Sequence, residues 1–356
     1  MTYFDILIRN GRIWDGERFI QGDVAIQKGK IAAIGEVQDF SPTYTYDATG
    51  AIVAPGLIDI HTHLRGLSDP VYEVNGEISC FPCGVTAVGD AGTWFESDEP
   101  KRSLLKMRLF PNVNVIDGKV DFSMADRVIA HYGPLAVGVK ATFDQGMFPD
   151  ITLDYFREIC DYAHKRGRKV MVHCVNPPVT MEQMLDCMKP GDICTHAFHG
   201  TGHSLTEDCF IAMRRARERG ILFDTGLAQG YHTNFEVLRE AIGAGLFPDT
   251  ISTDLTSYSM HTNNELFGIS AAISLLECLG MSEEEILASV TSRAARALGL
   301  EAECGYLHVG RRADVAVLRI CEICDKQTDR QKNVICLNKG YRCVLTIADG
   351  TIVYRR

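Results

Sequence analysis

Short apolar stretches alternate with turn residues at both ends of the 356-residue chain. In the first part, pairs such as Asn10-Gly11 and Asp15-Gly16 separate the apolar stretches, and Asp349-Gly350 repeats this pattern near the end. Asn-Gly and Asp-Gly pairs between apolar stretches are typical of β-hairpins. We therefore expect residues 1–54 and 304–356 to pair into one small β-sandwich domain.

The pattern changes over residues 55–303, where short β-type stretches alternate with helical patterns such as 153–166 and 234–244. The predicted strands end near eight positions, which are His63, Gly89, Ile116, Lys140, His173, His196, Asp224 and Asp254. Eight units in about 250 residues predict an α/β fold, a TIM-like (β/α)8 barrel with its active site at the carboxyl ends of the strands. A doubly wound sheet ranks second, because no Gly-x-Gly-x-x-Gly turn follows the first strand of this series.

Composition excludes several classes of protein. The 46% of hydrophobic and 23% of charged residues indicate a folded globular chain. Because 46 acidic residues outnumber 36 basic ones, the formal charge is -10, and we expect no nucleic-acid partner. No apolar run approaches the roughly 18 residues of a membrane span, so we expect no membrane partner and a cytoplasmic location. The 13 cysteines are then expected to be reduced, and their role stays open.

Residues that bind metals gather at the predicted strand ends. In the stretch 57–63, the period of two along a strand sends His61 and His63 to the barrel interior. His173, His196 and Asp254 end three further strands at the same level. Imidazole and carboxylate together suit zinc or a similar divalent ion. Each residue alone is weak support for a metal site, but the set predicts one.

Lys140 ends another predicted strand and would lie in the barrel beside cations, where burial and like charges oppose an ammonium group. If CO2 adds to its amine, the product is a carbamate anion with two oxygens that can bridge two metal ions. A lysine that forms a Schiff base or an ion pair is the alternative.

The order of these residues resembles the binuclear metal-dependent amidohydrolase superfamily. The resemblance covers nearly the whole chain and includes the stretches 50–59 and 305–314 on either side of the barrel. The stretches 84–92 and 248–255 are most similar to the dihydroorotase-like amidohydrolase/deacetylase branch. The resemblance implies two divalent ions, expected to be zinc, held by a set in which His61, His63 and Asp254 bind the buried ion, His173 and His196 bind the more exposed one, and carboxylated Lys140 bridges them.

Two loops depart from the family pattern. Relatives often carry a histidine just after the seventh strand, whereas this chain continues from Asp224, which we interpret as structural, and has His232 only nearby. The residues that follow Asp254 also differ. Because loops at this face select substrates, the physiological substrate stays open.

Arg65 follows the two histidines of the first strand at the same inward-pointing parity. A guanidinium there is expected to bind a substrate carboxylate through two hydrogen bonds, as dihydroorotase-like proteins do with the arginine of a His-x-His-x-Arg string. A bracing role for the loop is the alternative. Asn176, His199 and His232 also follow strand ends and are predicted to contact the substrate.

The sequence thus predicts a metal-dependent hydrolase of an amide or ester bond in a small, acylated, carboxylate-bearing compound. A hydroxide bridging the metals would attack the carbonyl, and Asp254 would be the catalytic acid and base. A cyclic amidase such as a dihydroorotase is the alternative within enzymes. An alternative of another class is a catalytically silent assembly protein, against which the full ligand set argues. A homo-oligomer and the native metal stay open.

Overall fold

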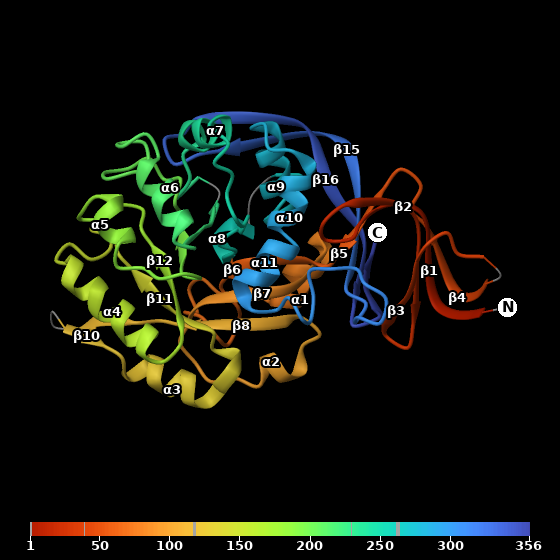
Figure 1. The fold of residues 1–356 in the computed structure, drawn as a ribbon, viewed down its shortest axis with the longest axis horizontal. Helices are drawn as coiled ribbons and strands as arrows, with labels where there is room; N and C mark the ends of the chain where they lie inside the picture. The colour runs from red at the N-terminus through yellow and green to blue at the C-terminus, as the bar shows by residue number, and fades with distance from the viewer. Residues whose placement is uncertain (1, 39, 117–118, 229, 261–263) are drawn as a thin grey trace.

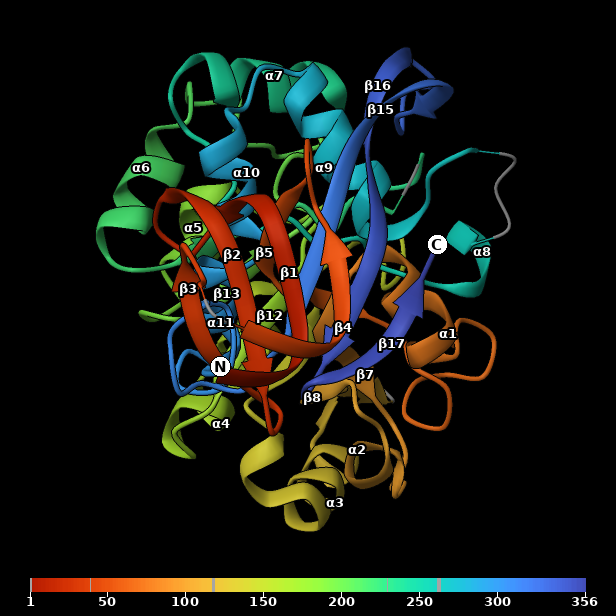
Figure 2. The same cartoon turned by 90° about the vertical axis from the view of Figure 1, so that its right-hand side faces the viewer.

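Both ends of the chain meet in one β-sheet. The computed structural model describes residues 2–38, 40–116, 119–228, 230–260 and 264–356. Eight strands form the terminal sheet: β1 (Thr2–Trp14), β2 (Phe19–Gln27), β3 (Lys30–Gly35), β4 (Phe40–Asp47), β5 (Ile52–Pro55), β15 (Val315–Thr328), β16 (Val334–Ala348) and β17 (Thr351–Arg355). The strand order is β17-β16-β15-β5-β1-β2-β3, and β4 pairs with β1, so strands from the two ends lie side by side (Figure 2).

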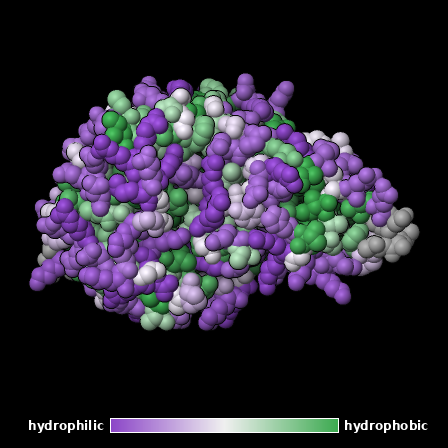
Figure 3. Space-filling view, viewed as in Figure 1, coloured by the Kyte–Doolittle hydropathy of each residue, from purple (hydrophilic) through white to green (hydrophobic). Residues whose placement is uncertain are grey.

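A shared apolar core joins the two ends of the chain within this sheet. Ile8 and Val24 from the first strands pack in one cluster with Val315 and Leu345 from the last strands, and all four are buried. Hydrophobic side chains also gather on the surface over the terminal sheet, while hydrophilic residues cover most of the remaining face (Figure 3).

The middle of the chain forms a parallel barrel. Seven of its strands are β6 (Leu57–Thr62), β7 (Val85–Thr93), β8 (Lys106–Pro111), β11 (Gly138–Thr142), β12 (Lys169–His173), β13 (Ile193–Thr195) and β14 (Leu222–Phe223). Parallel ladders join β6-β7-β8 and β11-β12-β13-β14, and single parallel bridges connect β8 to β11. The segment 250–255 closes the circle, because Thr250 bridges to Asp224 and Leu255 bridges to Thr62.

The third barrel strand differs from the prediction that it ends near Ile116. The barrel strand is β8, which ends at Pro111. Ile116 belongs to β9 (Asn114–Ile116), which pairs with β10 (Lys119–Asp121) in a separate two-stranded sheet. Both segments have the composition of a strand, and only β8 lies against the neighbouring barrel strands.

Helices surround the barrel (Figure 1). They are α1 (Gly76–Cys80), η1 (Phe81–Cys83), α2 (Glu99–Arg102), α3 (Ser123–Tyr132), η2 (Gly133–Leu135), α4 (Leu153–Lys165), α5 (Met181–Leu185), α6 (Ile211–Glu218), α7 (Phe235–Gly243), α8 (Ser257–Met260), α9 (Gly268–Cys278), α10 (Glu283–Ser289) and α11 (Ser292–Leu298). In α4, the buried residues Phe156, Ile159, Cys160 and Ala163 recur at the spacing of one helix face. Across the described ranges, no helix combines the length and the apolar character that crossing a bilayer requires.

A long hairpin connects the terminal sheet with the barrel. β15 and β16 run from the sheet across the top of the barrel to α7 (Figure 1). At the turn of this hairpin, Asp329 is fully buried and its Oδ2 accepts a hydrogen bond from the backbone N–H of Phe235, the first residue of α7, at 3.1 Å. The end of the chain therefore stabilises a loop at the carboxyl end of the barrel strands.

Candidate metal centre

The first cluster of possible metal ligands lies at the end of β6. His61, His63 and Asp254 offer ligand atoms that all lie within 4.8 Å of one another. The Oδ1 atom of Asp254 is 2.9 Å from His63 Nε2 and 3.2 Å from His61 Nε2. His61 and Asp254 are buried, and the side chain of His63 is 20% exposed, so His63 is the member of this cluster that solvent reaches most.

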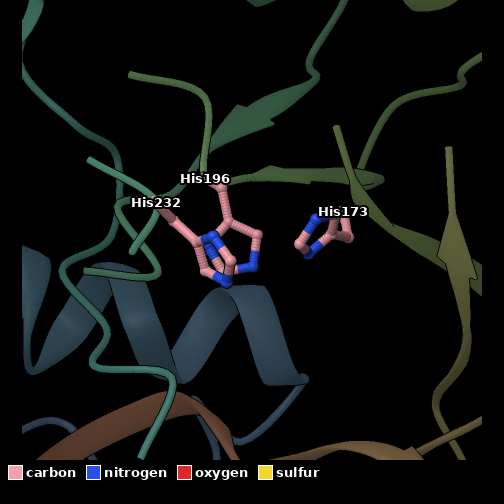
Figure 4. Close-up of side chains that lie close together, drawn as sticks. All are labelled: His173, His196 and His232. Carbon is pink, nitrogen blue, oxygen red and sulfur yellow. The ribbon is translucent and has the colours of Figure 1, made fainter. Parts of the chain in front are cut away.

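The second cluster consists of three imidazoles. His173 ends β12, His196 follows β13, and His232 comes from the loop after β14 (Figure 4). Their ligand atoms also lie within 4.8 Å of one another. The rings of His196 and His232 are the closest pair, with centroids 4.3 Å apart. The predicted ligands His173 and His196 are thus brought together, and His232 joins them.

Asp254 belongs to the first cluster and also faces the second. Its Oδ1 faces the first cluster, while its Oδ2 is 3.5 Å from His232 Nε2 and 4.0 Å from His196 Nε2. Burial raises the pKa of Asp254, but the electrostatic interaction with His61 and the hydrogen bond with His63 outweigh this effect and hold the pKa well below its usual value. The carboxylate is therefore ionised and has one oxygen toward each cluster.

Lys140 lies under the first cluster on β11. Its side chain is buried, and Nζ is 2.9 Å from His61 Nε2. Burial lowers the pKa of Lys140 to about 8, against the opposing effect of the Asp254 and Asp224 carboxylates. An amine with this pKa is partly neutral near physiological pH, and a neutral amine is the nucleophilic form.

A hydrogen-bond chain fixes the tautomer of His61. The hydroxyl of Thr195 donates its single hydrogen to Asp224 Oδ2 at 2.7 Å, so its oxygen accepts from His61 Nδ1 at 2.9 Å. The Nε2 atom of His61 then carries the lone pair, which faces the cluster and lies 2.9 Å from Lys140 Nζ. Asp224, which also accepts hydroxyl hydrogen bonds from Thr250 and Ser252, is connected to His61 by hydrogen bonds through Thr195.

His196 is oriented by a backbone carbonyl. Its Nδ1 donates to the oxygen of Gly226 at 2.7 Å, because a carbonyl only accepts, and this leaves Nε2 without a proton. The backbone φ of His196 is 57° and that of Asp254 is 51°, both in the left-handed region. Such conformations cost about 1–3 kcal/mol and concentrate at functional sites.

His173 is oriented by a carboxylate that the sequence did not single out. Asp144, in the loop after β11, accepts a hydrogen bond from His173 Nε2 at 3.0 Å. Pairs of this kind fix the ring of a metal-binding histidine and make it a better donor.

Several imidazoles of the site are neutral. Burial is the largest cause that holds the pKa of His61 and His196 well below the usual value, and neighbouring positive groups add to it. Burial also lowers the pKa of His232 to about 3. Neutral imidazole is the form that binds metal ions, so the donor set fits divalent cations.

The remaining predicted site residues lie in different surroundings. The side chain of Arg65 is 67% exposed, and its Nε is 3.6 Å from Glu73 Oε1. Asn176 is partly buried, and its Oδ1 lies close to Gly202. His199 is fully buried, with Nδ1 accepting from the backbone N–H of Thr201, and its Nε2 has no hydrogen-bond partner among the residues that the structure describes.

Known proteins resemble this chain over most of its length. The sequence model of the amidohydrolase family matches residues 52–353. A deacetylase of Agrobacterium fabrum is 30% identical over 353 residues, which cover 86% of this chain and 80% of that protein. A dihydroorotase of Syntrophotalea carbinolica is 26% identical, and the match covers 98% of this chain and 99% of the relative. A crystal structure of a dihydroorotase is similar with a TM-score of 0.85 and 25% identity, covering 98% of this chain and 97% of that chain.

Proposed function

Because the chain belongs to the amidohydrolase family, we propose that it hydrolyses an amide or ester bond in a small acylated compound that carries a carboxylate. The expected dihydroorotase-like branch, the barrel fold and the class of metal-dependent hydrolases are confirmed by these relatives. Since the relatives are named as enzymes, the alternative of a catalytically silent assembly protein loses its support.

The observation that carries the proposal is the ionised Asp254 between two ligand clusters. In the proposed site, His61, His63 and Asp254 hold one divalent ion, and His173 and His196 hold the other. We further propose that the ions are zinc and that the neutral amine of Lys140 adds to the carbon of CO2 and loses a proton, which gives a carbamate that would bind both ions. Bound divalent ions would supply Lewis-acid chemistry, which polarises a carbonyl and lowers the pKa of water.

Asp254 would move the proton in this reaction. Its carboxylate is ionised, so it accepts the proton of the attacking water and returns it to the leaving nitrogen or oxygen. Two other carboxylates near the site are less suited to move this proton, because they already accept hydrogen bonds from protein groups. Asp224 accepts from three hydroxyls, and Asp144 accepts from His173.

A screen of three substrate classes tests the proposal and its alternative. Protein purified with zinc and bicarbonate is incubated with N-acyl amino acids, O-acyl hydroxy acids and cyclic ureides, and chelator-treated protein is the control. We expect turnover of an acylated acid that is lost without metal. Turnover of the cyclic ureides alone would favour a cyclic amidase, which the dihydroorotase relatives support. Metal-loaded protein that hydrolyses no member of the three classes would contradict the proposal.

Three further expectations remain proposals. The sequence predicts that Arg65 binds the substrate carboxylate, and this prediction stays open; we propose that Asn176, His199 and His232 contact the substrate. We propose a cytoplasmic location, which the 13 free cysteines support. The expected partner is a small molecule.

A further inference from the structure

Arg330, at the turn of the β15–β16 hairpin, lies beside the second cluster. Its backbone N–H donates to the carbonyl of Thr233 at 2.9 Å, and its Nη1 donates to the carbonyl of Tyr231 at 2.7 Å. These two carbonyls flank His232 in the chain. Arg330 is therefore fixed at the same short loop that brings His232 to His173 and His196.

The charge of the guanidinium reaches two groups of the site. Arg330 lies close enough to His232 and to Asp144 for its positive charge to interact electrostatically with both. Arg330 thus places a positive charge at the edge of the second cluster.

In the part of the chain that the structure describes, Arg330 forms no ion pair. Asp144 has other partners, since it accepts from Gly146 N at 2.7 Å and from His173 Nε2 at 3.0 Å. A guanidinium has five N–H donors, so donors remain after the bond to Tyr231. Arg65, in contrast, is largely exposed and lies beside Glu73.

We propose that Arg330 binds the carboxylate of the substrate at the edge of the second cluster. This inference rests on the proposed function, and it names the residue that selects charged substrates. A guanidinium binds a carboxylate through two parallel hydrogen bonds, which fix orientation as well as position. The anchor then comes from the C-terminal hairpin, while the groups that act on the scissile bond come from the barrel.

Binding and turnover are measured with matched pairs of N-acetyl amino acids and their primary amides. The proteins are the wild type, Arg330→Met, Arg65→Met and Lys332→Met, and Lys332→Met removes one positive charge from the same turn. Calorimetry gives the affinity for each acid and amide, and elemental analysis gives the metal content. We expect Arg330→Met to weaken binding of the best acid by about ten- to hundredfold, with little change for its amide and with normal metal content.

The possible results separate this inference from the proposed function. Equal losses for acid and amide would make Arg330 a brace for residues 231–233, and a selective loss in Arg65→Met alone would place the anchor at Arg65. Either result overturns the inference, as does a wild type that binds no acid better than its amide. Selective binding through Arg330 without any turnover would instead contradict the proposed hydrolysis. Partial rescue of Arg330→Ala by free guanidinium ion would support a direct contact.

Discussion

The hydroxyl of Thr195 is predicted to control metal affinity through the tautomer of His61. In Thr195→Val, which keeps the shape of the side chain, His61 Nδ1 loses its acceptor at 2.9 Å and Asp224 loses one of its three hydroxyl donors. The proton of the neutral ring is then no longer held on Nδ1, and the alternative tautomer places it on Nε2, the atom that faces Asp254 at 3.2 Å.

The size of the effect follows from the groups left without partners. A buried donor without a partner costs about 1–3 kcal/mol, so the metal-free variant should be less stable by an amount in this range. Loss of a hydrogen bond that orients a metal ligand usually weakens metal binding by about 10- to 100-fold, or roughly 1.4–2.7 kcal/mol. We expect both effects in Thr195→Val.

Thr250→Val is the matched control. Thr250 donates to Asp224 Oδ1 at 2.8 Å and has no hydrogen bond to a histidine among those described. Thr250→Val should lower the free energy of unfolding, measured with denaturant, by a similar amount. It should leave the metal affinity, measured by chelator competition, nearly unchanged. Thr195→Ser, which keeps a hydroxyl, should restore affinity, and nitrogen NMR shifts of His61 should report the tautomer. Equal loss of metal affinity in Thr195→Val and Thr250→Val would refute the reasoning, because Thr195 would then act only through the fold.

Three other changes test the site. Wild-type protein prepared with bicarbonate should approach two metal equivalents by elemental analysis, and Lys140→Ala should lose metal and activity together; undiminished metal would exclude a bridging role. Asp254→Asn should fold but turn over at least about 100-fold more slowly, and near-normal turnover would show that another residue moves the proton. In Gly226→Ala, the new Cβ would lie 2.4 Å from His196 Nδ1 at a φ of +45°. We expect the free energy of unfolding in urea to fall by about 1–2 kcal/mol and the metal content to fall as well. Unchanged values of both would contradict the role of Gly226.

Local patterns were sufficient to predict the residues that the barrel strands carry. A parallel strand buried on both faces appears as a continuous apolar stretch, and in a barrel the residue at its carboxyl end lies at a shared level. The structure accordingly brings His61, Lys140 and His173 into one centre from three separate strands. The same reasoning could not distinguish β8 from β9, because the residues of a strand do not determine which other strand it pairs with.

The loops after the strands could not be predicted in this way. β6 ends at Thr62, so the period of two does not extend to Arg65, whose side chain is exposed. His232 reaches the second cluster from a loop that is stabilised by residues 329 and 330, about a hundred positions later. Contacts of this separation leave no periodic signal in the sequence.

The hairpin that reaches from the terminal sheet to α7 also sets an order in time. A ribosome adds about 5–20 residues per second, so residues that contain every proposed metal ligand are made roughly 4–15 s before Arg330. During this interval the nascent chain lacks Asp329 and Arg330, and the loop around His232 has neither of its supports. The residue proposed to recognise a charged substrate is thus made after all the residues proposed to hold the metal ions.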